Sequence, residues 1–176
     1  HLQLTFGETL CEVCEPFSDY QGWLSSSWLQ QQGLWLDVLP AAVDLPRRYC
    51  FRYLKVEVKA VSEKFRLRLN QIQVNAVTSA TQTCPPAVTT DPQLQAIDRV
   101  AVLTLKNCMQ EVFEDGPKRD RRLWLGDLRL QALVNDVTFA HHDLVRRCLY
   151  LFAGHTREDG MVSANVFVQP DVLADD

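Results

Sequence analysis

Residues 114–127 read Glu-Asp-Gly-Pro-Lys-Arg-Asp-Arg-Arg-Leu-Trp-Leu-Gly-Asp, and this charged stretch lies between two segments of helical periodicity. It brings carboxylates, basic groups and an indole into one short connection. Cleavage of a glycosidic bond needs a carboxylic acid that protonates the leaving oxygen and a second carboxylate that activates water, while an aromatic face holds the sugar. The stretch is therefore a candidate carbohydrate-cleaving site. The alternative is a solvated loop of surface ion pairs, which is the usual form of a charged run.

The composition excludes several classes of protein. The chain has 176 residues, of which 47% are hydrophobic and 23% are charged, with a formal net charge of −4. This is ordinary globular composition, with enough apolar residues for one or two modest cores. The negative charge and the lack of a basic block give a nucleic-acid partner little support. No apolar run approaches the roughly 20 residues that span a bilayer, so no membrane partner is expected. Because the first residue is His1 rather than Met, a preceding targeting segment stays an open alternative.

Six cysteines are spread along a chain that is too large and too apolar to need a disulfide framework. We therefore expect reduced thiols and a cytoplasmic protein. Cys11 and Cys14 have the spacing of half a zinc site or of a redox pair, but no second pair of this kind follows. His141-His142 beside Asp143 favours a helix N-terminus over a metal site, because adjacent residues do not share a helix face. We expect neither a metal nor a cofactor.

The first 80 residues are predicted to form an antiparallel sheet that is part of a sandwich. Residues 52–61 alternate between apolar and charged side chains, which is typical of a half-buried strand. The alternation continues in the following residues but slips by one position at Asn70-Gln71, which predicts a bulge or a tight turn there. Two short aromatic strands are expected earlier, over 23–29 and 34–39, and prolines follow them.

The second half is predicted to be all-helical up to a short extended tail. Residues 81–92 form a proline- and threonine-rich linker, and Asp91-Pro92 offers an N-cap followed by proline at the first helical position. A helix of about five turns follows, and two more are expected over 127–139 and 142–153. Gly154 stops the last helix, and Asp159-Gly160 turns the chain into the tail. The side chains expected on the buried faces are Leu94, Ile97, Ala101, Leu105, Cys108 and Val112, then Leu130, Leu133, Val134 and Val137, and finally Val145, Cys148, Leu149 and Phe152.

The segment from Val112 to Asp127 closely resembles the active-site signature of bacterial α-L-rhamnosidases, which are inverting glycoside hydrolases with an (α/α)6 barrel. Its Asp-x-Pro-x-Arg-acid…Trp-x-Gly-Asp pattern is specific. Residues 45–53 resemble the edge of the β-sandwich that precedes the barrel, and residues 159–162 resemble the loop that closes the barrel's second helical pair. The organisation that this resemblance implies is α+β, with part of an antiparallel β-sandwich over 1–80, a linker over 81–92 and the first helices of an (α/α)6 barrel over 93–176.

The resemblance also implies roles for single residues. Asp115 and Asp127 match the carboxylates that hold the rhamnose hydroxyls, Asp120 matches the general acid, and Arg119 and Trp124 would position the sugar. Two fixed carboxylates would raise the pKa of a third and keep Asp120 protonated near neutral pH. Two alternatives stay open. The loop arginines could form buried ion pairs with the aspartates that only orient the loop, and the indole of Trp124 between two leucines could belong to the core.

One departure from the family pattern concerns the general acid. In this family the acid is usually Glu and often stands one residue further on, where this chain has Arg121. The shorter side chain of Asp120 withdraws the proton by about a bond length, and such misplacement can lower a rate about a hundredfold. The expected substrate is therefore a glycoside with terminal α-L-rhamnose or a related sugar.

The general base is a second gap. In inverting enzymes the two carboxyl groups stand about 6.5–9.5 Å apart, and in this family the base is a glutamate from later helices. The late acids of this chain are expected to be solvated surface groups: Glu158, Asp171, Asp175 and Asp176. Three helices would also leave apolar stripes exposed. We therefore expect a hydrolase fragment that is inactive alone, or that forms a homo-oligomer through those stripes. The alternatives are a carbohydrate-binding protein without turnover and a structural module.

Overall fold

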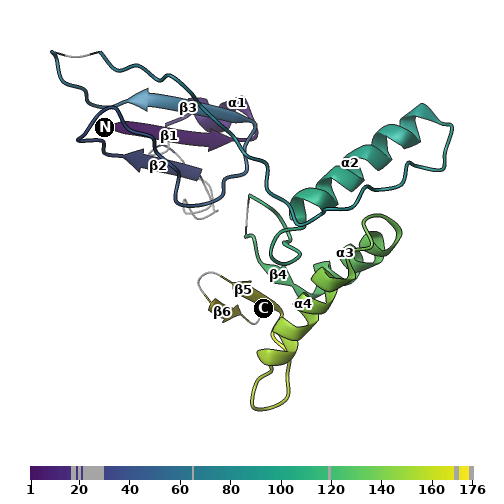
Figure 1. Cartoon of the computed structure of the whole chain (residues 1–176). Helices are drawn as coiled ribbons and strands as arrows, with labels where there is room; N and C mark the ends of the chain where they lie inside the picture. The colour runs from purple at the N-terminus through teal and green to yellow at the C-terminus, as the bar shows by residue number, and fades with distance from the viewer. Residues whose placement is uncertain are drawn as a thin grey trace. The chain divides into compact units, whose positions relative to one another are not determined.

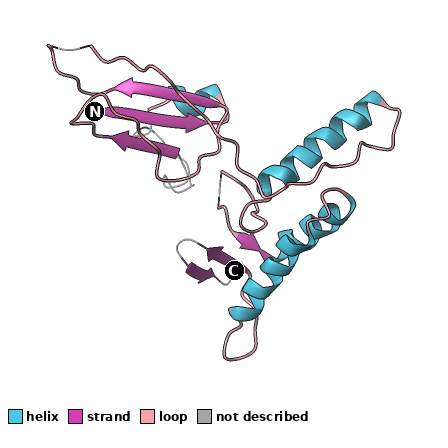
Figure 2. Cartoon of the chain, in the orientation of Figure 1, coloured by secondary structure: helices cyan, strands magenta, loops and turns pink. Residues whose placement is uncertain are grey.

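The computed structural model describes residues 1–16, 19, 21, 30–64, 66–118, 120–168 and 171–174, the last four and residue 168 by their backbone alone. Two compact units follow one another along the chain, residues 1–74 and residues 75–176. The first is built mainly from strands and the second mainly from helices, as Figure 2 shows. The predicted α+β fold class, with an antiparallel sheet followed by helices, is confirmed.

A three-stranded antiparallel sheet forms the first unit, with the strand order β2-β1-β3 (Figure 1). β1 spans Leu2–Gly7, β2 spans Gln30–Leu34 and β3 spans Tyr53–Val58. In the central strand, Leu4 lies opposite Gln32 of β2 and opposite Val56 of β3. A short helix, α1 (Leu10–Cys14), follows β1.

The apolar side chains of β1 all lie on one face of the strand. Leu2, Leu4 and Phe6 share one face of the strand and are all buried. Phe6 also stacks on Tyr49, with ring centroids 4.0 Å apart. Gly7 permits the close approach of α1, because a Cβ at this position would lie 2.9 Å from the Cβ of Glu12.

The strand predicted over 52–61 is confirmed, with shorter ends, as β3. The strand predicted over 34–39 is wrong, because β2 ends at Leu34. Trp35 follows it with 73% of its surface exposed and stacks on His1. The aromatic strand predicted over 23–29 lies outside the described residues.

The continuation of the sheet beyond β3 is also wrong. Residues 66–78 contain no strand, so the predicted bulge at Asn70-Gln71 has no ladder to interrupt. Apolar side chains that alternate here, such as Ile72 and Val74, are exposed. Alternation favours an extended backbone, but a strand also needs a neighbouring strand that accepts its hydrogen bonds.

Three helices form most of the second unit: α2 (Pro92–Cys108), α3 (Leu125–Val137) and α4 (His142–Gly154). The predicted cap of α2 is confirmed, since Asp91 Oδ1 accepts a hydrogen bond of 2.8 Å from the Gln93 amide. α3 and α4 lie side by side (Figure 1).

The turn between α3 and α4 is closed by backbone and side-chain hydrogen bonds. The Ala140 amide donates to the Asn135 carbonyl oxygen at 2.7 Å, and Ala140 has a φ of 51°. His141 Nδ1 then accepts a hydrogen bond from the Leu144 amide, which makes His141 the N-cap of α4. The predicted helix N-terminus at these histidines is therefore confirmed.

A second antiparallel sheet, in the order β4-β5-β6, completes this unit. It contains β4 (Leu123–Trp124), β5 (Asn165–Val168) and β6 (Asp171–Ala174). The tail is extended, as predicted, but the prediction of only helices before it is wrong, because the tail returns as a hairpin and pairs with β4. One core joins the sheet to the helices, and its members include Leu105, Met109, Phe113, Leu123, Leu128, Phe139, Cys148, Phe152 and Val166.

The buried face of α3 differs from the prediction. Leu128 and Asn135 are buried, whereas the side chains predicted to be buried are 41–74% exposed: Leu130, Leu133, Val134 and Val137. Periodicity shows which side chains share a face, but the neighbouring elements decide which face is covered. The prediction that apolar stripes are exposed is confirmed.

The other two helices follow the prediction in part. In α2, Leu105 and Cys108 are buried, and in α4, Cys148 and Phe152 are buried. The side chains that prove exposed instead are Leu94, Ile97, Ala101 and Leu149, while Val145 is partly buried and Val112 is buried beyond the end of α2. None of the helices in the described ranges is long and apolar enough to cross a membrane.

Candidate active site

The charged stretch lies between α2 and α3 and is attached to the core by the residues that precede it. Phe113 is fully buried, and its amide donates to Cys148 Sγ of α4 at 3.4 Å. The Glu114 amide donates to the carbonyl oxygen of Cys108, the last residue of α2, at 2.9 Å. Gln131 Nε2 of α3 donates to the Glu114 carbonyl oxygen at 2.7 Å. All three helices therefore fix the start of the loop.

Asp115 closes the loop onto Arg122 through two hydrogen bonds of 3.0 Å. The Asp115 amide donates to the Arg122 carbonyl oxygen, and the Arg122 amide donates to Asp115 Oδ1. Between them, Asp120 and Arg121 have φ values of 62° and 54°, in the left-handed region that non-glycine residues adopt with strain. Asp115 is thus a structural clamp of the loop as well as a candidate sugar ligand.

Burial raises the pKa of the Asp115 carboxyl from 3.8 to about 6. The Arg122 and Gly116 amides oppose this shift, because their hydrogen bonds favour the ionised form, and the charges of Asp120 and Asp127 add to it. Asp120 and Asp127 therefore lie close enough to Asp115 to influence its carboxyl group. The raised pKa falls on the residue that the resemblance assigns to hydroxyl binding, and near pH 6 this group can accept or donate a hydrogen bond.

The remaining predicted residues occupy different positions around the loop. Asp120 is half-buried within it, and Asp127 is exposed in the first turn of α3. Trp124 is the N-cap of α3 and is half-buried, whereas the neighbouring Leu123 is fully buried. The indole Nε1 of Trp124 is buried and has no hydrogen-bond partner among the described residues. Arg119 lies outside the described residues.

Phe167 of β5 also contacts the loop, and the sequence reasoning does not find it. The Arg122 guanidinium lies over the Phe167 ring, with Cζ 5.2 Å from the ring centroid. Arg122 thus meets Asp115 through its backbone and Phe167 through its side chain. Phe167 stands in a short apolar strand, and only the pairing of that strand with β4 reveals that it faces the loop.

Among the late acids, Glu158 is the one whose side chain the structure describes. Glu158 is exposed, in a turn closed by a hydrogen bond of 2.9 Å from the Gly160 amide to the Arg157 carbonyl oxygen. The turn predicted at Asp159-Gly160 is confirmed, and Gly160 adopts the positive φ of 82° that favours glycine. Asp171 belongs to β6, and residues 175–176 lie outside the described part of the chain.

The cysteines do not form a metal or redox centre of recognisable geometry. Cys11 and Cys14 are free, exposed thiols on α1. Within the ranges that the structure describes, no three histidine, cysteine or acidic side chains gather as potential metal ligands. Cys148 is fully buried, and burial raises the pKa of its thiol to about 11.

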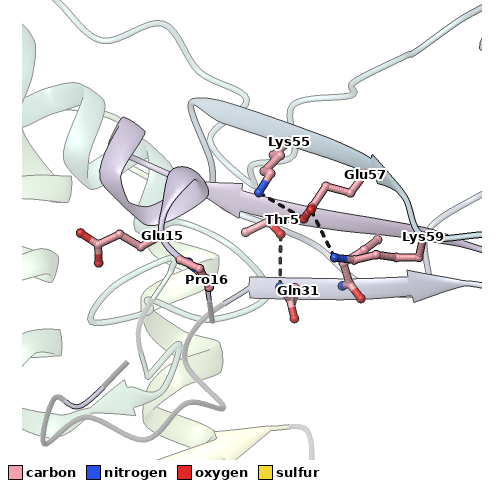
Figure 3. Close-up of a pocket in the computed structure, with 8 residues that line it drawn as sticks. Thr5, Glu15, Pro16, Gln31, Lys55, Glu57 and Lys59 are labelled. Carbon is pink, nitrogen blue, oxygen red and sulfur yellow. Dashed lines mark hydrogen bonds and ion pairs between the residues drawn. The ribbon is translucent and has the colours of Figure 1, made fainter. Parts of the chain in front are cut away.

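A hollow of about 350 Å³ lies in the first unit over the polar face of the sheet (Figure 3). Lys55 Nζ and Lys59 Nζ form ion pairs with the Glu57 carboxylate, each at 3.2 Å. Thr5 Oγ1 accepts a hydrogen bond from Gln31 Nε2 at 3.3 Å. The polar groups of these side chains therefore bind one another, as the dashed lines in Figure 3 show. The charged loop between α2 and α3 is therefore the better candidate site.

Two family models and one solved structure match the chain. Residues 1–76 match the glycosyl hydrolase family 78 alpha-rhamnosidase N-terminal domain, and residues 87–174 match the bacterial alpha-L-rhamnosidase 6 hairpin glycosidase domain. A solved structure described as a rhamnosidase from Klebsiella oxytoca with rhamnose bound is 88% identical to the chain, with a TM-score of 0.92. The match covers 99% of this chain and 34% of that one, so this chain spans about a third of its length. No curated protein matches the chain.

Proposed function

Because the chain belongs to the bacterial α-L-rhamnosidases of glycosyl hydrolase family 78, we propose that the longer protein to which it corresponds removes terminal α-L-rhamnose, or a related sugar, from glycosides. The observation that carries the proposal is the clamped loop, in which Asp115 is held by Arg122 within the electrostatic reach of Asp120 and Asp127. A hydroxyl-rich ligand needs such fixed carboxyl groups, because each accepts hydrogen bonds in a set direction.

In the proposed mechanism, Asp120 donates a proton to the glycosidic oxygen as the bond to the leaving group breaks. Asp115 and Asp127 hold the sugar hydroxyls. A water molecule, deprotonated by a second carboxylate, attacks the opposite face of the ring, so the product has inverted configuration. Trp124, through its aromatic face, and Arg119 are proposed to position the sugar.

The general base is proposed to come from a part of the protein other than this chain. The base must stand about 6.5–9.5 Å from the acid across the bond, and Glu158 is an exposed turn residue. The 176 residues alone should therefore bind sugar weakly and turn over no substrate.

A second candidate is association through the exposed apolar face of α3, which consists of Leu130, Leu133, Val134 and Val137. Apolar stripes of this kind are normally covered by a partner or by further elements of the same protein. A molecular mass that rises with concentration, together with a melting temperature that rhamnose does not change, would favour this candidate.

The test uses the full-length protein that contains this chain and compares it with Asp120→Asn. With phenyl α-L-rhamnoside, whose leaving group needs protonation, the substitution should lower kcat/KM about 10²- to 10⁴-fold. With a dinitrophenyl rhamnoside, whose dinitrophenolate leaves without protonation, the substitution should lower kcat/KM much less. NMR of the first-formed sugar should show inversion. Glu158→Gln is the control and should keep the wild-type rate. Equal losses with both leaving groups, or no loss, would remove Asp120 from the role of acid.

A further inference from the structure

We propose that Arg122 and Phe167 are a positioning pair, in which the Phe167 ring holds the Arg122 side chain so that the Arg122 backbone keeps Asp115 in the geometry for sugar binding. This inference rests on the proposed function and adds two residues to it. Neither residue touches the substrate in this scheme, because both act through Asp115.

The contact between the two side chains has the geometry of a cation–π interaction. The Arg122 Cζ lies 5.2 Å from the Phe167 centroid, within the range of about 6 Å in which a ring face attracts a guanidinium. Arg122 Nε is buried and makes no hydrogen bond to the described residues. The attraction of the guanidinium to the Phe167 ring therefore offsets part of the cost of burying this donor. Removal of the ring would leave a buried donor without either kind of partner.

The strand pairing explains why this contact controls the loop. Leu123 lies opposite Val166, and Trp124 lies opposite Asn165, in the antiparallel pair of β4 and β5 (Figure 1). Leu123 and Val166 are both almost fully buried. The contact of Arg122 with Phe167 continues this pairing by one residue beyond β4 and into the loop. The end of the loop is thereby held by β5, through the strand pairing and the contact with Phe167.

Arg122 transmits that support to the candidate site through its backbone. Its amide and carbonyl groups make both hydrogen bonds that close the loop on Asp115. The two positive φ values at Asp120 and Arg121 store strain between these ends. If residue 122 is released, the strain favours opening of the loop, and the Asp115 carboxyl loses the amide that orients it.

The test compares Phe167→Leu, which keeps an apolar side chain but removes the ring, with Phe167→Tyr, which keeps the ring. Both are made in the full-length protein, and kcat/KM for an aryl α-L-rhamnoside and the Kd for rhamnose are measured. Phe167→Leu should lower kcat/KM about 10- to 100-fold and weaken rhamnose binding about tenfold. Phe167→Tyr should restore both to within about threefold of wild type. Phe139→Leu removes a ring from the core of this unit, beyond the far end of α3 from the loop, and should leave Kd unchanged in the folded protein.

The outcomes separate this inference from the proposed function. A wild-type protein that hydrolyses the rhamnoside, with Phe167→Leu equal to Phe167→Tyr in both measurements, overturns the positioning pair alone. A loss of thermal stability in Phe167→Leu with unchanged Kd also overturns it, because the ring would then be only structural. A wild-type protein that neither hydrolyses the rhamnoside nor binds rhamnose overturns both proposals.

Discussion

The half-buried carboxyl of Asp115 should make the stability of this chain depend on pH in an unusual direction. Its pKa is about 6 in the folded chain and 3.8 by its ordinary value, so the folded state holds the proton more tightly. Stability from this group is therefore full below about pH 3.8 and is lost as the pH rises through about 6. A pKa difference of this size corresponds to about 3 kcal/mol. Solvent screening at a half-exposed group reduces this to on the order of 1.5 kcal/mol.

Asp115→Asn removes the ionisation but keeps an oxygen that can accept the Arg122 amide. Urea denaturation of both proteins at about pH 4 and about pH 7 measures the difference in free energy of unfolding, which cancels the titration of every other carboxyl group. The wild type should lose about 1.5 kcal/mol relative to Asp115→Asn over this range. Glu111→Gln, at an exposed carboxyl group, controls for the change in net charge. A wild type that instead gains relative stability with pH would refute the reasoning, since it would mean that a cation pairs with Asp115.

Three further predictions test the packing. Iodoacetamide should alkylate the exposed Cys11 in the native protein much faster than the fully buried Cys148, whose thiol pKa is raised to about 11, and equal rates in peptide mass spectra would contradict this. Asp91→Ala should lower the free energy of unfolding by about 1 kcal/mol in chemical denaturation, and Asp91→Asn should restore most of it. Leu123→Ala should cost about 2–5 kcal/mol, whereas Leu130→Ala should change stability by less than about 0.5 kcal/mol, because Leu130 is 61% exposed. A large loss at Leu130 would show that the α3 face is covered in solution.

Features that depend on neighbouring residues follow well from the sequence. The cap of α2 at Asp91 and the turn at Asp159-Gly160 are found where they are predicted, because each depends on a few adjacent residues. The buried faces of the helices follow less well. Leu130 and Val137 share an apolar stripe, but the elements packed beside α3 decide whether that stripe is covered.

Pairing between strands that are far apart in the sequence cannot be predicted from the local pattern of residues. Residues 66–78 alternate like a strand but pair with no strand in the described part of the chain. β4 has two residues, too few for a pattern to predict, and it pairs with β5. The same limit applies to the candidate site. The signature points to Asp115 and Asp127 directly, whereas the place of Phe167 follows only from the register between β4 and β5.

The pairing of β4 with β5 also has a consequence for how the protein is made. Leu123 cannot pair with Val166 until Val166 has emerged from the ribosome, about forty residues later. At translation rates of roughly 5–20 residues per second, this delay is about two to eight seconds. During that interval α3 and α4 are synthesised, and the charged stretch is exposed without the hairpin that pairs with β4. This window is when chaperones or proteases would have the easiest access to the chain.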